Sequence, residues 1–481
     1  MIDRMSLARQ AECVRTGVLS SVDLVNHYLT AIRQFNPAIN AIIQMPDEAE
    51  LLRQAAEADA DVVRGKPLGP LHGVPITLKD VLHVRGFRLS RGVSQFLGGV
   101  SEQDATAVRR LREAGALFLG LTNVPELCMS FETDNLIYGR TNNPHDVQRT
   151  PGGSSGGEAA AIAAGLSPAG LASDAGGSVR LPAHFSGICG LKLTQGRVPL
   201  TGQFPRERAG LFHHTSSFGV MGRYVSDVET LGRLIAGPDG HDPDTVAAPW
   251  DDAGQPCDLQ QLRVAFTYET ARVAPSASVR RVLDQVREHA THLVGETLLA
   301  TPPRLEDANE LMWRLFITGN DGGAGWRQLL DGIGKRRSTP QLEGLVRMSE
   351  EVRPTVLEVK QDWTDMDQFR YQLAAFFRAH DLLITPVHPD VAFAHGQSLL
   401  DRQAYGYVFP FSLSGSPALV MNAGHDPVTG LPIGIQIVAP HWQEHRLLSF
   451  ARALEARLPA WTPARPSTHT PVRTPCNGVA S

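Results

Sequence analysis

The stretch "TPGGSSGGEAAAIAAG" runs from Thr150 to Gly165 and joins a Gly-rich loop to an Ala-rich run. Ser154 and Ser155 stand between two Gly-Gly pairs, directly before a segment whose alanine content predicts a helix. A loop that only has to turn needs one or two glycines, whereas this one lets backbone and hydroxyl groups approach another group closely. The stretch therefore predicts a loop with a close partner, at the N-terminal end of a helix.

Helical and strand-like segments alternate on both sides of this loop. Residues 104–127 combine a helical pattern, a glycine and then a short apolar run. Residues 156–183 repeat this order with the Ala-rich helix, a turn, a short strand and a second Gly-Gly-Ser. Such alternation is typical of an α/β fold, in which helices cover both faces of a sheet.

The composition is that of an ordinary globular protein and excludes several classes of function. The 481 residues include 42% apolar and 20% charged residues, with a formal net charge of −5. This balance gives no reason to expect a nucleic-acid partner. No apolar run is long enough to predict a membrane-spanning helix or a secretory signal. We therefore expect no nucleic-acid partner and no membrane partner.

The cysteines indicate neither a disulfide framework nor a metal site. The chain has five of them, Cys13, Cys128, Cys189, Cys257 and Cys476. They lie far apart and form no CxxC pair and no His/Cys cluster with zinc spacing. We expect reduced thiols in a cytoplasmic protein that needs no metal and no cofactor.

Three segments carry residues that could act together on a carbonyl group. "GVPITLKD" places Lys79 at the end of an apolar run, the opening stretch supplies Ser154, and "SDAGGSVRLPA" places Ser178 after two glycines. A serine hydroxyl needs a base to become a nucleophile, and a lysine kept neutral by burial can be that base. Gly176 and Gly177 would let successive backbone N–H groups converge on one spot, as an oxyanion hole requires. One serine of the pair could then pass a proton from Ser178 to Lys79.

Each motif alone also has an ordinary structural interpretation. A Gly-Gly-Ser is usually a flexible turn, and a lysine at a strand end is usually a surface charge. Four histidines are alternative bases: His72, His83, His213 and His214. With Lys79 available, we expect them to be structural or merely near the substrate. Residues 202–219, "GQFPRERAGLFHHTSSFG", form either a wall of a substrate channel or a surface loop, and we favour the channel.

In this order and spacing, the motifs together resemble the amidase signature family. The matching segments are "GVPITLKD", "RTPGGSSGGEAAAIAAG", "DAGGSVRLPAHFSGICGLKLTQGRV", "DLLITPV" and "FSLSGSPALVMNAG". The 24 positions from Ser154 to Ser178 also fit. The resemblance covers residues 70–235 and 380–456, whereas residues 240–370 match little. It implies an α/β fold with a central mixed, mostly parallel twisted sheet covered by helices on both faces.

The resemblance implies a catalytic role for three residues. Ser178 would be the nucleophile that forms an acyl-enzyme. Ser154 would be the bridging serine, joined to Gly153 by a cis peptide bond. Lys79 would be the neutral general base and later the proton donor. Together they would form a Ser-cisSer-Lys catalytic triad.

The same resemblance implies roles for the residues around these three. The oxyanion hole would consist of the backbone N–H groups of Ala175, Gly176, Gly177 and Ser178. Ser155 and Asp174 would support the network, and Cys128 and Met129 would line the acyl pocket. Cys128 could also be an ordinary buried thiol. Relatives often have Thr or Ile at position 175, but alanine should serve equally because only its backbone acts.

We therefore expect an amidase, a serine hydrolase that cleaves the C–N bonds of linear carboxylic amides. Carbamates (urethanes), anilides or aryl esters are alternative substrates for the same triad. A glutaminase subunit of a tRNA-dependent amidotransferase is less favoured, because the acidic balance offers no tRNA surface. Residues 204–223 also lack the Ser-Leu-Asp pattern that such subunits carry. The expected partner is a small-molecule amide or carbamate.

The expected organisation is an N-terminal helical segment, residues 1–65, packed on a single domain, residues 66–465. Within that domain, a variable region at about 200–370 would shape the substrate pocket. Residues 466–481 are rich in Pro, Ser and Thr and are expected to be a disordered tail. The chain is expected to be a monomer or a homodimer.

Overall fold

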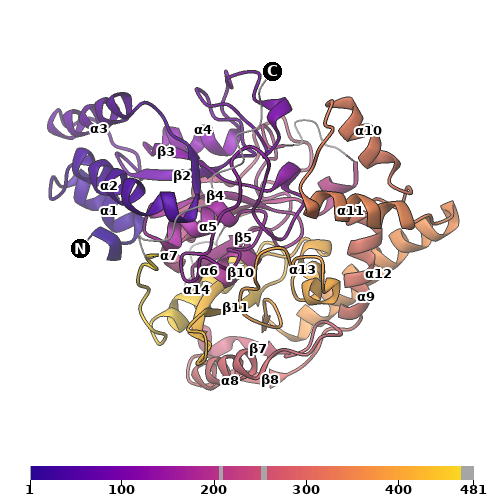
Figure 1. Ribbon diagram of the computed structural model, residues 1–481. Helices are drawn as coiled ribbons and strands as arrows, with labels where there is room; N and C mark the ends of the chain where they lie inside the picture. The colour runs from indigo at the N-terminus through magenta and orange to yellow at the C-terminus, as the bar shows by residue number, and fades with distance from the viewer. Residues whose placement is uncertain (1, 205–209, 251–256, 467–481) are drawn as a thin grey trace.

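An 11-stranded sheet runs through the computed structural model, which describes residues 2–204, 210–250 and 257–466 (Figure 1). The strands are β1 (Ile42–Gln44), β2 (Pro75–Lys79), β3 (Leu117–Thr122), β4 (Ala169–Asp174), β5 (Cys189–Lys192), β6 (Ser217–Gly222), β7 (Arg263–Phe266), β8 (Glu296–Leu299), β9 (Leu382–Pro386), β10 (Ala418–His425) and β11 (Pro432–Val438). Their order is β1-β3-β2-β4-β6-β5-β10-β11-β9-β7-β8. Because β2 and β4 are neighbours, the sheet brings Lys79 close to the loop that carries Ser178.

The sheet is mixed, as expected, but it is not mostly parallel. Within the described chain, the parallel pairs are β3–β2, β2–β4, β9–β7 and β7–β8. The central pairs from β4 to β9 are antiparallel, and so is β1–β3. β10 and β11 form a hairpin across residues 426–431, and a short connection of this kind always gives antiparallel strands. The expectation of a mostly parallel sheet is therefore corrected.

Helices cover both faces of the sheet, as expected for this α/β fold. Leu419 of β10 belongs to a buried cluster with α4, α7, α8 and α14, whereas the next residue, Val420, belongs to a cluster with α5, α6 and α9. Successive strand residues point to opposite faces, so the two clusters lie on opposite sides of the sheet. These helices are α4 (Thr106–Glu113), α5 (Gly156–Ala163), α6 (Arg180–Ser186), α7 (Val225–Ile235), α8 (Ala277–Thr291), α9 (Leu305–Met312) and α14 (Glu444–Glu455).

Three helices and one short strand make up the N-terminal stretch. α1 (Leu7–Arg15), α2 (Ser21–Ile39) and α3 (Glu48–Val63) lie together on one side of the molecule (Figure 1). Ser20 and Asp23 form a capping box at the start of α2. β1 lies between α2 and α3 and pairs with β3. α2 shares a buried cluster with Ala160 and Ala161 of α5, so the N-terminal helices support the helix that follows the Ser154 loop.

A layer of helices lies on the other side of the molecule from α1–α3 (Figure 1). A single π-helical turn, Trp313–Ile317, follows α9 directly. The next helices are α10 (Ala324–Gly332), α11 (Pro340–Glu351), α12 (Val356–Ala379) and α13 (Phe409–Leu413). Thr339 and Thr355 cap α11 and α12, as their side chains accept backbone N–H groups of the first turn. This layer contains residues 305–370 of the region whose sequence matched little.

Parts of two sequence-based expectations fall outside the described residues. These parts are residues 467–481 of the expected tail and residues 205–209 of the expected channel wall. No helix within residues 2–204, 210–250 and 257–466 is both long and apolar enough to cross a membrane.

Candidate active site

Lys79 ends the interior strand β2 with its side chain fully buried. The strands on both sides of β2 run parallel to it, and all of its residues are buried. Lys79 Nζ donates hydrogen bonds to Ser154 Oγ at 2.8 Å and to the hydroxyl and carbonyl oxygens of Ser173 at 3.1 and 3.3 Å. Burial lowers the pKa of Lys79, although the charges of neighbouring groups oppose this shift. The site therefore favours a neutral amine that can accept a proton.

The adjacent carboxylate of Asp80 does not pair with Lys79. It is buried and accepts hydrogen bonds from the backbone N–H of Ser90 at 3.0 Å and from the Ser90 hydroxyl. Burial raises the pKa of Asp80 to about 7, although the bonds from Ser90 oppose the shift. Among the described residues, Asp80 thus forms no close ion pair that would hold Lys79 in its charged form.

Ser154 lies between Lys79 and Ser178. The peptide bond that joins Gly153 to Ser154 is cis, as expected. The hydroxyl oxygens of Ser154 and Ser178 are 3.0 Å apart. Hydrogen bonds thus run without a gap from Lys79 through Ser154 to Ser178. A Cβ at position 153 would lie 2.6 Å from the carbonyl oxygen of Ser130, so the loop needs glycine before Ser154.

Ser155 supports the loop and lies outside the line of hydrogen bonds from Lys79 through Ser154 to Ser178, which we call the relay. Its hydroxyl donates to the Ser173 carbonyl oxygen at 3.4 Å, and its backbone N–H donates to the Ser178 carbonyl oxygen at 3.1 Å. Ser173 also accepts hydrogen bonds from Lys79. Ser155 thus connects the loop of Ser154 to the loop of Ser178 at the point where Lys79 is held.

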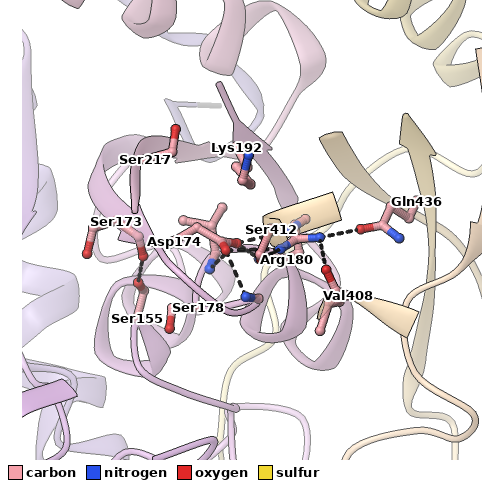
Figure 2. Close-up of polar contacts among 12 residues, drawn as sticks. Ser155, Ser173, Asp174, Ser178, Arg180, Lys192, Ser217, Val408, Ser412 and Gln436 are labelled. Atoms are coloured by element: carbon pink, nitrogen blue, oxygen red, sulfur yellow. Dashed lines mark hydrogen bonds and ion pairs between the residues drawn. The ribbon is translucent and has the colours of Figure 1, made fainter. Parts of the chain in front are cut away.

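A buried ion pair holds the loop that carries Ser178 (Figure 2). Asp174 ends β4 and Arg180 begins α6, and Arg180 Nε lies 3.0 Å from Asp174 Oδ2. Arg180 also donates to Gln436 Oε1 at 2.9 Å and to Ser412 Oγ at 2.6 Å. Burial raises the pKa of Asp174, but the charge and hydrogen bonds of Arg180 outweigh this effect and lower it to about 2. The ionised pair therefore ties the loop to α13 and β11.

The backbone N–H groups of this loop, which are the expected oxyanion hole, are not all alike. The Gly177 N–H donates to Asp174 Oδ1 at 2.7 Å and is therefore already in use. The N–H groups of Ala175, Gly176 and Ser178 have no hydrogen-bond partner among the described residues. Gly177 has a φ of 98°, and a Cβ there would meet a valine side chain at 2.6 Å. Three of the four expected N–H groups are thus unpartnered among the described residues, and the fourth is bonded to Asp174.

A largely apolar pocket lies beside Ser178. Cys128 and Met129 line it, together with Ala175, Gly176 and Ser178. The other described lining residues are Ser130, Phe131, Phe212, Met312, Trp313, Ile317, Gln341, Leu345 and Leu399. No Asp, Glu, Lys or Arg occurs among the described lining residues. The pocket can therefore hold an uncharged apolar group next to the Ser178 hydroxyl.

Cys128 lies where the pocket meets the relay. It and the preceding Leu127 both have left-handed backbone conformations, with φ of 60° and 53°. Burial raises the pKa of the Cys128 thiol, although the charge of Lys79 and a hydrogen bond with Ser154 oppose the shift. Cys128 is thus a half-buried thiol that lines the pocket.

The sequence did not identify most of the pocket wall. Trp313 and Ile317 lie four positions apart in the π-helical turn, and Gln341 and Leu345 lie four positions apart on α11. This spacing places each pair on one helix face, but any core-facing helix shows the same signal. Phe212 belongs to the segment 202–219, so the described part of that segment reaches the pocket.

The four histidines considered as bases contact other groups. They are His72, His83, His213 and His214, and they contact Ala58, Ser101, Asp244 and Trp363 respectively. None of them lines the pocket as far as the chain is described. In the same described ranges, no group of three His, Cys, Asp or Glu side chains is placed to hold a metal ion.

Known proteins resemble this chain along nearly its whole length. A family model described as Amidase matches residues 23–448. An acylamidase of Rhodococcus erythropolis is 32% identical over 483 residues, which cover 96% of this chain and 97% of the relative. A glutamyl-tRNA(Gln) amidotransferase subunit of Chloroflexus aggregans is 33% identical, with 94% of this chain and 95% of the relative covered. A structure of 6-aminohexanoate cyclic dimer hydrolase complexed with substrate matches with a TM-score of 0.82 at 25% identity, covering 98% of this chain and 100% of that one.

Proposed function

Because the chain belongs to the amidase family, we propose that it is a serine hydrolase that cleaves carboxylic amide C–N bonds through an acyl-enzyme on Ser178. The observation that carries this proposal is the unbroken line of hydrogen bonds from Lys79 to Ser178. Lys79 Nζ lies 2.8 Å from Ser154 Oγ, which lies 3.0 Å from Ser178 Oγ. These separations suit proton transfer between neighbouring groups.

In the proposed acylation, Ser178 Oγ attacks the carbonyl carbon of the amide. Its proton passes to Ser154 Oγ, and the proton of Ser154 passes to the neutral amine of Lys79. Both serine hydroxyls can rotate, so each can donate in one step and accept in the next. The buried position of Lys79 supports this role, because burial lowers its pKa and so favours the neutral form.

The attack places negative charge on the carbonyl oxygen. The unpartnered N–H groups of Ala175, Gly176 and Ser178 are suited to stabilise that charge. The ion pair of Asp174 with Arg180 holds the loop in place before the substrate arrives. Preorganised donors of this kind need no rearrangement when the charge develops.

Collapse of the tetrahedral intermediate breaks the C–N bond. The leaving nitrogen takes its proton from Lys79 through Ser154, and Lys79 becomes neutral again. Water then attacks the acyl-enzyme, and its proton moves through Ser154 to Lys79. When the C–O bond to Ser178 breaks, the same proton returns to the Ser178 oxygen. The products are a carboxylic acid and an amine.

The same addition and collapse operate on anilides, aryl esters and carbamates, so we include them in the proposed substrate range. An ester or carbamate carbonyl would occupy the position of the amide carbonyl beside Ser178. The apolar lining residues support acyl groups that carry alkyl chains or rings.

A glutaminase subunit of an amidotransferase is the second candidate, because one amidotransferase subunit is 33% identical to this chain. Glutamine carries a charged amino group and a charged carboxylate, which need charged or strongly polar partners when they are buried. The described lining residues supply no charged side chain, which counts against glutamine. Co-purification of a partner subunit, with faster hydrolysis of glutamine than of arylalkyl amides, would favour this second candidate.

Ser178→Ala tests the proposed function directly. Turnover of an arylalkyl p-nitroanilide should fall by roughly 10³-fold or more, while circular dichroism shows an unchanged fold. A fluorophosphonate should label the wild-type protein once, at Ser178, and should not label the variant. Retention of more than roughly a tenth of the wild-type rate, or labelling at Cys128, would overturn the assignment of Ser178.

A further inference from the structure

Packed aromatic rings form part of the pocket wall. Phe131 stacks on Tyr405 with ring centroids 3.6 Å apart, and Trp313 meets Phe409 edge to face at 5.7 Å. Phe131 and Trp313 face the pocket, while Tyr405 and Phe409 are fully buried behind them. Rings held in this way present a firm surface that suits another flat apolar group.

Most polar side chains of this wall already have partners. Trp313 Nε1 donates to a backbone carbonyl oxygen at 3.3 Å, and Ser130 Oγ accepts a backbone N–H at 3.1 Å. Cys128 and Ser178 contact the relay through Ser154. Each of these groups therefore already has at least one hydrogen-bond partner, so none is buried with its polar atom unpaired.

Gln341 is the exception among the described lining residues. It is the second residue of α11 and lies one turn before Leu345, which lines the same pocket. Its side-chain oxygen Oε1 is buried and has no hydrogen-bond partner in the described chain. A buried carbonyl oxygen without a donor costs free energy, and a ligand that supplies the donor recovers it.

We propose that Gln341 selects substrates by accepting a hydrogen bond from an N–H or O–H group on a ring-bearing acyl portion. This inference rests on the proposed function and names its substrate class. The class is uncharged aryl or arylalkyl amides whose acyl part combines an apolar ring with one hydrogen-bond donor. An analogue without the donor fills the same apolar space but leaves Oε1 unpaired.

The test compares acyl p-nitroanilides that differ only in the donor. The set contains phenylacetyl, 3- and 4-hydroxyphenylacetyl, and the two corresponding methoxy compounds. The wild-type kcat/KM should be about tenfold higher for at least one hydroxy compound than for the unsubstituted and methoxy compounds. Gln341→Met should abolish this preference, because it should slow the hydroxy compound more than the unsubstituted and methoxy compounds. Gln341→Glu keeps an acceptor oxygen and should retain the preference.

A matched control separates pocket chemistry from general effects of removing a buried amide. Gln372 on α12 also has a buried Oε1 without a partner in the described chain, but it does not line this pocket. Gln372→Met should therefore leave the preference unchanged. Loss of the preference in this variant would contradict a specific role for Gln341.

A binding experiment distinguishes failure of this inference from failure of the proposed function. The dissociation constants of the same compounds are measured with Ser178→Ala, alone and combined with Gln341→Met. Suppose that the wild-type protein turns over none of the compounds, that a hydroxy compound binds more tightly than the others, and that Gln341→Met abolishes this tighter binding. This result would reject the proposed function and support the inference about Gln341. Equal turnover and equal binding of hydroxy and unsubstituted compounds by the protein with Gln341 would overturn the inference and leave the proposed function standing. The comparison of hydroxy and unsubstituted compounds on the protein with Gln341 does not depend on whether Gln341→Met folds.

Discussion

At the scale of single residues, Lys79 shows how the fold changes the chemistry of a common side chain. Its ammonium group is removed from water, and its hydrogen-bond partners are hydroxyl and carbonyl oxygens of Ser154 and Ser173. Neither partner carries a negative charge that would hold the lysine protonated. Burial therefore lowers the pKa of Lys79. Arginine could not replace it as a base, because a guanidinium group stays protonated in proteins.

The proposed base predicts a definite pH dependence. Only neutral Lys79 accepts a proton, so kcat/KM should rise as the pH rises through the lowered pKa and level off above it. Lys79→Ala and Lys79→Arg should both lose roughly 10³-fold or more at every pH. The measurement is kcat/KM from about pH 6 to about pH 10 for all three proteins. A wild-type profile that falls above neutral pH without loss of fold, or a near-normal Lys79→Ala, would contradict the lysine base.

The Ser178 loop predicts a strong effect of a single methyl group. Gly177→Ala adds a Cβ at a φ of 98° and only 2.6 Å from Val408 Cγ2. The loop must shift, and the three unpartnered N–H groups shift with it. We expect kcat/KM to fall at least about 100-fold, the scale for losing one oxyanion-hole donor.

Gly98→Ala is the matched control for this substitution. A Cβ at Gly98 has no heavy atom within 4 Å, and its φ lies outside the left-handed region. This variant should keep the wild-type kcat/KM. Equal activity of the two alanine variants would show that the conformation of Gly177 is not needed for catalysis.

The sequence predicts which candidate catalytic residues come together, but not every bond that they make. Lys79, Ser154 and Ser178 are predictable because their motifs combine residue type, glycine pattern and spacing. The hydrogen bond from the Gly177 N–H to Asp174 is not predictable, because it depends on the orientation of the Asp174 side chain relative to the loop. Gln341 is not predictable either, because a polar residue in the first turn of a helix is usually solvated.

At the scale of elements, the alternation of helix and strand predicts the α/β class. The direction of each strand cannot be deduced from the sequence around it. The parallel pairs β2–β3 and β2–β4 follow from crossover connections that include α4 and α5. The antiparallel centre joins β4, β6, β5, β10, β11 and β9. β5 and β10 are neighbours although about 225 residues separate them along the chain. No local pattern encodes such a pairing, and the family resemblance had implied a mostly parallel sheet.

The position of α11 over the pocket depends on a buried cluster. Lys335 Nζ lies 2.6 Å from Glu126 Oε1, and both side chains are buried. Thr339, which caps α11, donates its backbone N–H and hydroxyl to Glu126 Oε2 at 2.7 and 2.9 Å. Glu126 begins the short turn that ends at Cys128. The cluster thus joins two walls of the pocket.

Glu126→Gln should loosen α11 and reduce stability. It leaves the Lys335 ammonium group buried without its counter-charge, which costs about 3 kcal/mol of unfolding free energy. KM should rise more than kcat falls, because α11 carries the pocket-lining Gln341 and Leu345. Both effects are measured by denaturant unfolding and by steady-state kinetics with an arylalkyl p-nitroanilide.

Glu350→Gln provides the comparison on the same helix. Glu350 pairs with Arg327 across a largely exposed surface, so its loss should cost about 0.5 kcal/mol or less. The KM of this control should match that of the wild type. Similar stability and KM for the two Gln variants would show that the Glu126 cluster does not hold α11.

At the scale of the whole molecule, Arg223 connects the two ends of the described chain. It follows β6, and its guanidinium group donates to the Asp3 carbonyl oxygen and to the Tyr28 hydroxyl, each at 2.5 Å. The same group lies over the ring of Trp461, 5.3 Å from its centroid. N-terminal and C-terminal residues therefore meet at the end of one central strand. We propose on this basis that residues 1–65 fold together with the following domain.

Arg223→Met should weaken both ends of the chain at once. The substitution removes two hydrogen bonds and the cation–π contacts with Tyr28 and Trp461, while a methionine can fill part of the buried space. We expect a loss of about 2 kcal/mol in unfolding free energy and faster chymotryptic cleavage near both termini. The kcat/KM at 25 °C should stay near the wild-type value, because Arg223 contacts none of the proposed catalytic groups. Arg109→Met serves as the control, since Arg109 forms a half-exposed pair with Glu113 and its loss should change stability little. Cleavage that speeds up at only one terminus, or equal stability of the two methionine variants, would show that Arg223 does not join the ends of the chain.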